Sequence, residues 1–169
     1  WTAHVIAGTL AFEDAVRLVH LRGRLMQQAV PLGEGSMAAL IGVDEATVLR
    51  ACDAAAAFGV VAPATFNGDG HIVVSGHTEA VRRAGEAALS FGALKVIPLE
   101  VSAPFHSPLM APAQAPLEEA LGRVEVRPPQ IPVCSNVDAS FPTTPADVRR
   151  SLVDQLVAPV RWEACLAAL

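Results

Sequence analysis

The chain has 169 residues, of which 52% are apolar and only 17% are charged. This balance is typical of one ordinary domain with a sizeable core, or of the interior of a larger protein. The net charge of −5 without a basic stripe argues against nucleic acid as a partner, and the longest apolar stretch, residues 54–66, is broken by Gly59 and Pro63, which argues against a membrane span.

Cysteine usage gives no sign of a disulfide framework or a metal site. The three cysteines, Cys52, Cys134 and Cys165, are far apart in the sequence and odd in number. A reducing, cytoplasmic location fits this pattern best. The chain opens on Trp1, inside an expected helix, and we therefore expect both ends to be internal to a longer protein.

The first clear element is a helix expected over residues 12–29. Its apolar positions recur at spacings of three and four residues, as on one face of a helix: Ala15, Leu18, Val19, Leu25, Met26 and Ala29. Arg22 falls in the centre of this apolar stripe, whereas Arg17, His20, Arg24 and Gln27 fall on the opposite side.

The position of Arg22 needs an explanation, because a guanidinium stays charged wherever it is placed and is costly to bury alone. One interpretation is that Arg22 extends to solvent or pairs with a carboxylate of the same protein. The other is that it binds a substrate carboxylate through two hydrogen bonds. The pattern alone does not separate the two.

Residues 36–99 predict a self-contained block. Strands are expected over 36–42, 60–66, 71–75 and 93–99, with helices beginning at Asp44 and Thr78. The sequence Asn67-Gly-Asp-Gly70 between the second and third strands is a strong hairpin signal. The order β-α-β-β-α-β is that of the ferredoxin-like split βαβ unit.

The stretch Val101-Ser-Ala-Pro-Phe-His-Ser-Pro-Leu-Met110 follows the last of these strands. Pro104 and Pro108 restrict the backbone on both sides of His106, so the imidazole is held in a rigid elbow. Histidine is suited to proton transfer near neutral pH. A loop histidine alone is more often a surface or capping residue, and other features must decide its role.

The last third of the chain predicts further α/β elements. A helix is expected over 108–122, a short apolar strand over 131–135, a helix from Thr144 to about residue 157, and another from residue 161 to 169. Asn136 directly follows the expected strand. Because ligands gather at strand C-termini in open parallel sheets, Asn136 is a candidate binding residue, although asparagine is also common in plain turns.

Together these motifs resemble the malonyl-CoA:acyl carrier protein transacylases, the acyltransferase family of fatty-acid and polyketide synthesis. The resemblance is carried by residues 12–23, 37–42, 102–110, 135–138 and 159–162, which occur in the order of the family and cover nearly the whole chain. It implies an α/β-hydrolase-like core with an inserted ferredoxin-like subdomain. The expected division is 1–33 and 100–169 in the large subdomain and 34–99 in the small one.

The resemblance also implies an activity, namely transfer of a malonyl group from coenzyme A to the phosphopantetheine thiol of acyl carrier protein through an acyl-serine. His106 would be the catalytic base, and the backbone carbonyl of Gln155 would orient it. Arg22 would bind the malonyl carboxylate. Phe105 would disfavour a methyl-branched substrate. Asn136 and Met26 are further expected substrate contacts. The partners would be malonyl-CoA and acyl carrier protein, the enzyme a monomer, and no cofactor beyond the thioester would be needed.

The 169 residues depart from the family in ways that bear on activity. The nucleophilic serine of the family sits in a Gly-His-Ser-x-Gly-Glu elbow that immediately precedes the position matched by Trp1, and no Gly-x-Ser-x-Gly occurs in this sequence. The glutamine loop and the C-terminal Gly-Pro-Gly segment of the family are also absent. We therefore expect these residues to be the middle of the enzyme, inactive on their own.

Two alternatives remain beside fatty-acid synthesis. The same motifs occur in acyltransferase domains of polyketide synthases, embedded or acting in trans, and only flanking sequence separates the two. A third interpretation is a non-catalytic fragment that binds carrier protein or coenzyme A without turnover. A serine elbow upstream of Trp1 would exclude that third interpretation.

Overall fold

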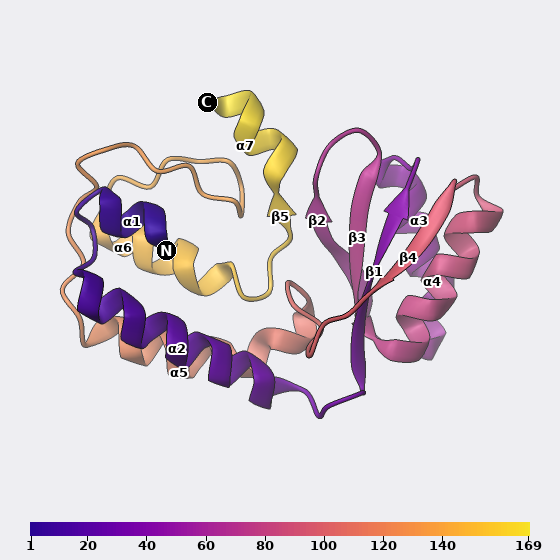
Figure 1. The fold of residues 1–169 in the computed structure, drawn as a ribbon, viewed down its shortest axis with the longest axis horizontal. Coiled ribbons are helices and arrows are strands. Elements are labelled where there is room, and N and C mark those ends of the chain that lie inside the picture. The colour runs from indigo at the N-terminus through magenta and orange to yellow at the C-terminus, as the bar shows by residue number, and fades with distance from the viewer.

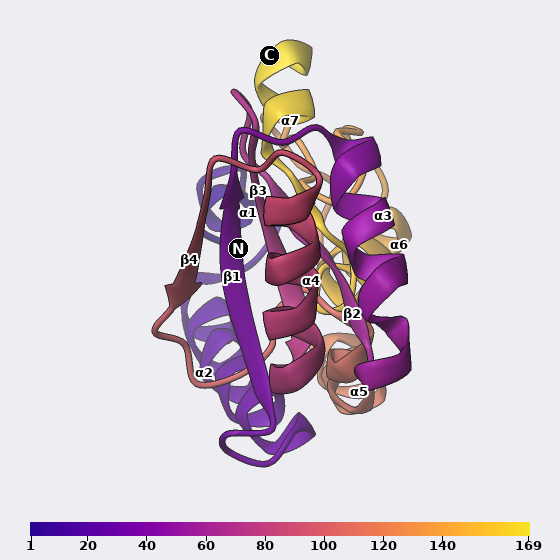
Figure 2. The ribbon, with the colours of Figure 1, turned by 90° about the vertical axis from the view of Figure 1, so that its right-hand side faces the viewer.

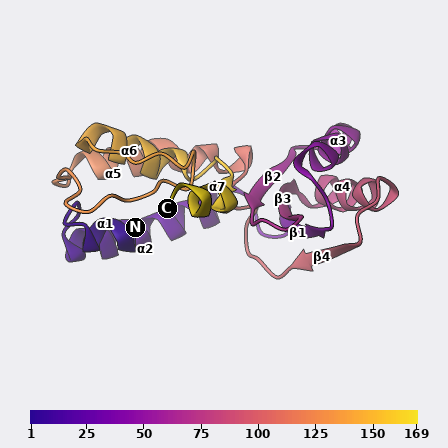
Figure 3. The same ribbon diagram turned by 90° about the horizontal axis from the view of Figure 1, so that it is seen from above.

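The computed structural model describes all residues from 1 to 169, and they form two halves that lie side by side (Figure 1). One half is a sheet with helices, made by a continuous stretch of chain. The other half is mainly helical and is made by the two ends of the sequence. Figure 3 shows the helical half beside the sheet, with the C-terminal helix near the junction.

The sheet half has the predicted β-α-β-β-α-β order. Its elements are β1 (Gly35–Ile41), α3 (Glu45–Ala55), η1 (Ala56–Phe58), β2 (Val61–Phe66), β3 (His71–His77), α4 (Thr78–Ser90) and β4 (Lys95–Leu99). The strand order is β4-β1-β3-β2, and all three neighbouring pairs are antiparallel. A short fifth strand, β5 (Val160–Arg161), pairs in parallel with the end of β2.

Local sequence explains why these elements begin and end where they do. The Asp44 side chain accepts a hydrogen bond of 2.8 Å from the Thr47 amide, which satisfies a free donor at the start of α3. Asp69 has a φ of 50° and its two glycine neighbours also have positive φ, which the hairpin turn between β2 and β3 requires. The hairpin prediction is confirmed.

Helices α3 and α4 cover one face of the sheet (Figure 2). Leu40 and Val74 from the strands are buried there against Val48 and Val81 from the helices. The opposite face is also largely apolar, and its buried apolar strand residues are Met37, Ala39, Ala64 and Val73. Phe105 packs against that second face, so the elbow that carries His106 lies on the side of the sheet away from α3 and α4.

The helical half contains α1 (Thr2–Ile6), α2 (Phe12–Ala29), η2 (Pro108–Ala113), α5 (Gln114–Gly122), α6 (Pro145–Asp154) and α7 (Trp162–Ala168). The bounds predicted for α2 are confirmed. Its core is a cluster around fully buried leucines on three segments, Leu117, Leu121, Leu152 and Leu156, with Leu18 of α2 against them.

Three expectations for this half were wrong. The helix expected over 108–122 divides into a 3₁₀ segment and an α-helix, because Pro112 lacks an amide donor and its ring clashes with the preceding turn. Residues 131–135 form no strand, since Pro132 cannot donate and no segment of the chain pairs with them. Val19 lies outside the buried stripe of α2 and is 45% exposed.

Two further findings concern the chain as a whole. None of its helices combines the length and apolar character needed to cross a membrane. No three side chains among histidine, cysteine, aspartate and glutamate are arranged so that they could hold a metal ion.

Candidate active site

His106 lies in a tight turn between β4 and η2. Its φ is 55°, a left-handed conformation that is uncommon for any residue other than glycine. The Ser107 hydroxyl donates 2.6 Å to the Pro104 carbonyl, and the Met110 amide donates 3.0 Å to the Ser107 carbonyl. These contacts hold the strained backbone in place. Strained residues of this kind are concentrated at functional sites.

A second contact sets the orientation of the imidazole. Nδ1 of His106 donates to the backbone carbonyl of Gln155, 2.9 Å away. Since a carbonyl can only accept, the neutral ring carries its proton on Nδ1, and Nε2 is left as the proton acceptor. This is the contact that the family resemblance implied for Gln155. It gives His106 the tautomer that a general base needs.

The surroundings of His106 also favour the neutral ring. Burial, and after it the positive charge of Arg22, hold the pKa of His106 below its ordinary value, while the carbonyls of Gln155 and Ala158 act in the opposite direction. A histidine with a lowered pKa is unprotonated over more of the pH range, so it can accept a proton from a nucleophile there.

Arg22 projects from the middle of α2 and is half-buried. Its Nε is buried without a hydrogen-bond partner, and no carboxylate of the chain lies within ion-pairing distance of its guanidinium. Exposed arginines of the chain, such as Arg82 and Arg123, do have carboxylate partners. Burial lowers the pKa of Arg22, although an arginine remains charged. Pairing with an internal carboxylate, one part of the first interpretation of Arg22, is therefore wrong, while extension to solvent and binding of a substrate carboxylate stay predictions.

Asn136 lies behind Gln155 as seen from His106. The side-chain amide of Gln155 donates 2.6 Å to the Oδ1 atom of Asn136. The backbone carbonyl of Asn136 accepts 2.8 Å from the Arg161 amide in β5. The structure thus brings His106, Gln155 and Asn136 into one chain of hydrogen bonds. A direct contact of Asn136 with substrate stays a prediction.

Phe105 and Met26 occupy different environments. Phe105 is half-buried and packs against both the helical core and the second face of the sheet, so it lies at the junction of the two halves beside His106. Met26, one turn after Arg22, is buried in the core of the helical half. The roles of both in substrate binding stay predictions.

Sequence reasoning missed two residues that help to place the site. A Cβ atom on Gly35 would come within 2.4 Å of the Pro104 ring, so only glycine at the start of β1 allows the elbow to approach the sheet. Arg161 stacks on Phe66 of β2, 4.8 Å from its ring centre, which ties β5 to the sheet. For Gly35, the only signal in the sequence was a glycine directly before an expected strand.

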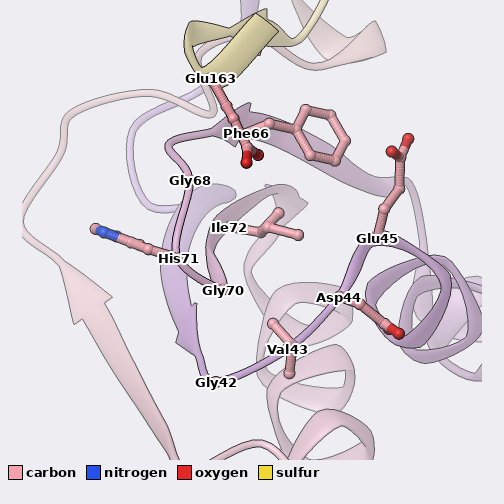
Figure 4. A pocket seen from close by; sticks show the side chains of 10 residues that line it. All are labelled: Gly42, Val43, Asp44, Glu45, Phe66, Gly68, Gly70, His71, Ile72 and Glu163. Atoms are coloured by element: carbon pink, nitrogen blue, oxygen red, sulfur yellow. The ribbon is translucent and has the colours of Figure 1, made fainter. Parts of the chain in front are cut away.

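A separate cavity of about 440 Å³ lies between the β2–β3 hairpin, the start of α3 and α7 (Figure 4). Its charged rim is formed by Asp44, Glu45 and Glu163, with His71 on another side. The cavity is lined by none of the residues His106, Gln155, Arg22, Asn136, Phe105 and Met26. It is therefore distinct from the site around His106.

The structure thus combines an α/β fold, a histidine oriented by a backbone carbonyl and a half-buried arginine without a carboxylate partner, an arrangement compatible with acyl-transfer chemistry. The acyl transferase domain model matches residues 1–169, and the chain belongs to this family.

Several relatives show how far the similarity extends. The malonyl CoA-acyl carrier protein transacylase of Escherichia coli (strain K12) is 47% identical over 162 residues, which are 96% of this chain and 52% of the relative. A crystal structure of an acyl carrier protein S-malonyltransferase from Vibrio cholerae superposes with a TM-score of 0.95 at 44% identity, covering 97% of this chain and 54% of the other.

A third structure holds a type II polyketide synthase (PKS) acyl-carrier protein in complex with its malonyl-transacylase. It has a TM-score of 0.92 at 45% identity and covers 94% of this chain and 52% of the other. The chain thus spans about half the length of the relatives that it matches.

Proposed function

We propose that this chain supplies the base and the carboxylate-binding residue of an enzyme that transfers a malonyl group from malonyl-CoA to the phosphopantetheine thiol of acyl carrier protein. The observation that carries the proposal is the bond between His106 Nδ1 and the Gln155 carbonyl at 2.9 Å, which leaves Nε2 as the acceptor. Relatives that are 47% and 44% identical bear the name malonyl CoA-acyl carrier protein transacylase.

The proposed reaction proceeds in two half-reactions. Nε2 of His106 accepts the proton of a serine hydroxyl, supplied by a part of the protein outside these 169 residues, while the serine oxygen attacks the thioester carbonyl. The tetrahedral intermediate collapses, the carbon–sulfur bond breaks, and the departing thiolate of coenzyme A takes the proton from His106. In the second half-reaction the carrier-protein thiol gives its proton to His106 and attacks the acyl-serine, and the serine oxygen takes that proton back.

Arg22 gives the proposed reaction its preference for malonyl over neutral acyl groups. Its Nε is buried without a partner, and a substrate carboxylate would satisfy it with a charge-assisted hydrogen bond. Phe105, beside His106, would form the wall that disfavours a methyl branch. The reaction uses only side chains of the protein, the malonyl-CoA thioester and the carrier-protein thiol, so the proposal includes no further cofactor.

The test compares Arg22→Ala with the parent in the full-length protein, using malonyl-CoA and acetyl-CoA as donors. Since only malonyl carries a carboxylate, we expect kcat/KM to fall about a hundredfold for malonyl-CoA and only a few fold for acetyl-CoA. Arg22→Lys keeps the charge but not the two-pronged geometry. Its kcat/KM for malonyl-CoA should therefore lie between the values of the parent and of Arg22→Ala. Equal losses with both donors would contradict the proposed role of Arg22.

Fatty-acid synthesis is the pathway we propose, with polyketide synthesis as the second candidate. The similarity to a malonyl-transacylase in complex with a type II PKS carrier protein favours keeping that second candidate. Rates of transfer to a fatty-acid carrier protein and to a type II polyketide carrier protein, measured side by side, separate the two.

We also propose that residues 34–99 are a small ferredoxin-like subdomain inserted between 1–33 and 100–169, and that the complete enzyme is a monomer of the cytoplasm. The sheet order β4-β1-β3-β2 with two helices on one face supports the subdomain. Three cysteines that form no disulfide support a reducing compartment. Limited proteolysis would test the subdomain by cutting near residues 33 and 100 first.

A further inference from the structure

We propose that Asn136 is a positioning residue for the catalytic base. It acts through Gln155, whose side chain it holds and whose backbone carbonyl holds His106. The inference rests on the proposed function, because it assumes that His106 is the base. It assigns to Asn136 a role behind the site instead of a contact with substrate.

Asn136 belongs to a turn that is anchored on several sides. Within the turn, the Ser135 amide donates to the Ser140 carbonyl and the Ala139 amide donates to the Ser135 carbonyl, both at 2.8 Å. Ala139 adopts a φ of 58°, so the turn is held in a conformation that is uncommon for alanine. Asp138 accepts bonds from the amide and the hydroxyl of Ser140. The turn is therefore fixed internally.

Three neighbouring elements also hold this turn. The hydroxyls of Ser135 and Ser151, the latter on α6, lie 2.8 Å apart. The Cys165 thiol of α7 donates 3.4 Å to the Ser135 carbonyl. The Arg161 amide of β5 donates 2.8 Å to the Asn136 carbonyl. Asn136 thus presents its Oδ1 atom from a platform that the helices α6 and α7 and the strand β5 build together.

Gln155 needs such support because of where it lies. It directly follows α6, at the point where the helix ends and the last carbonyl groups have no partner within the helix. Its carbonyl is the acceptor for His106, so a small rotation of this peptide would break the contact with Nδ1. The bond of 2.6 Å from the Gln155 side chain to Asn136 joins this peptide to the platform and resists that rotation.

Loss of the Asn136 side chain should lower the pKa of His106. The Gln155 carbonyl stabilises the protonated ring and so raises the pKa of His106, against burial and the Arg22 charge, which lower it. If Asn136 no longer holds Gln155, the carbonyl contact weakens and the pKa of His106 falls further. The acid limb of the pH–rate profile would then move to lower pH, while the maximal rate would fall because the ring is less well oriented.

The experiment measures formation of the acyl-enzyme from malonyl-CoA in the full-length protein, across the pH range in which histidine titrates. For Asn136→Ala we expect kcat to fall about tenfold, with KM unchanged, as for loss of one uncharged hydrogen bond that acts on orientation. The acid limb should move to lower pH. Gln155→Ala keeps the backbone carbonyl but loses the side-chain bond, and should reproduce both changes.

Two further variants test whether the bond itself is responsible. The double variant Asn136→Ala, Gln155→Ala should be no worse than either single one, because both remove the same interaction. Asn136→Asp keeps an acceptor oxygen at the same position and should restore most of the rate. Ser140→Ala, which loosens the same turn without touching Gln155, serves as the matched control and should leave the pH profile in place.

Several results would overturn the inference. A raised KM with unchanged kcat in Asn136→Ala would make Asn136 a substrate ligand. Losses that multiply in the double variant would show that the two residues act separately. The same pH shift in Ser140→Ala would indicate general loosening of the turn. If His106→Ala kept its rapid acylation, the proposed function itself would fail. If His106→Ala lost rapid acylation as expected but Asn136→Ala had no effect, only the positioning role would be overturned.

Discussion

The two halves of the molecule differ in how regular their backbone is. In the sheet half, hydrogen bonds between four antiparallel strands and within two helices leave few irregular residues. Its positive φ angles lie in turns and at the ends of elements. In the helical half, the segments 101–107 and 131–144 follow no regular pattern and contain His106 and Ala139 with positive φ. Every residue assigned a role in the proposed reaction lies in this irregular half.

This difference indicates that the two halves have different roles. The sheet half presents an apolar second face against which Phe105 of the elbow packs. The helical half holds His106 in a strained turn and Arg22 on a helix without a carboxylate partner. Changes in the sheet half away from the elbow should therefore alter mainly stability, and changes at the elbow or in the helical half should alter rate.

The largest effect is expected for His106→Ala in the full-length protein. Loss of a general base costs on the order of a thousandfold in rate, and rapid acylation by malonyl-CoA should disappear. Because His106 is only half-buried, the midpoint of urea unfolding should change little. A burst of acyl-enzyme in this variant would show that another residue is the base.

A pair of glycine variants separates a change inside the sheet from a change at its contact with the elbow. A Cβ on Gly76, within the sheet, would lie 2.0 Å from the Val60 carbonyl oxygen, so Gly76→Ala should cost about 3 kcal/mol of stability. A Cβ on Gly35 meets the Pro104 ring at 2.4 Å, so Gly35→Ala should also displace the elbow and lower kcat/KM on the order of tenfold.

Urea unfolding and kcat/KM measured on both variants check this pair. Gly23→Ala is the control, since nothing lies within 4 Å of a Cβ there and alanine favours a helix. It should leave the rate unchanged and raise the stability slightly. Equal rate losses in the Gly76 and Gly35 variants would show that contact with the elbow is not what lowers the rate.

Phe105→Ala tests the junction between the halves. Removal of the ring should raise the ratio of kcat/KM for methylmalonyl-CoA to that for malonyl-CoA about tenfold, because a hydrophobic wall discriminates one methyl group by about 1–3 kcal/mol. Stability should fall too, since the ring packs against both halves. The ratio of the two substrates does not depend on the folded fraction. An unchanged ratio would assign Phe105 to packing alone.

The smallest effect concerns pH. Burial and the Arg22 charge hold the pKa of His106 below its ordinary value, so the acid limb of kcat/KM should lie below the usual titration range of histidine. Arg22→Met removes the charge, and the pKa of His106 should rise, moving that limb to higher pH. Acetyl-CoA is the suitable donor, because it does not need Arg22. If the acid limb stays in place, the charge of Arg22 does not act on the pKa of His106.

Much of the regular structure was predictable from local patterns. The bounds of α2, the cap at Asp44, the hairpin at Asn67-Gly-Asp-Gly70 and the order of elements in the sheet half were confirmed. Each depends on residues close together in the chain, where periodicity and turn chemistry act. The strand at 131–135 was wrong because strand formation needs a partner, and Pro132 removes a donor.

The sequence by itself determined the elements of the sheet half, the constrained setting of His106 between two prolines, and the place of Arg22 on the apolar stripe of its helix. Only the tertiary structure decided that Arg22 has no internal carboxylate, that the Gln155 carbonyl orients the ring, and that Asn136 stands behind Gln155. These contacts join residues 19 and 49 positions apart. No local preference encodes such distances, since packing of whole elements brings the atoms together.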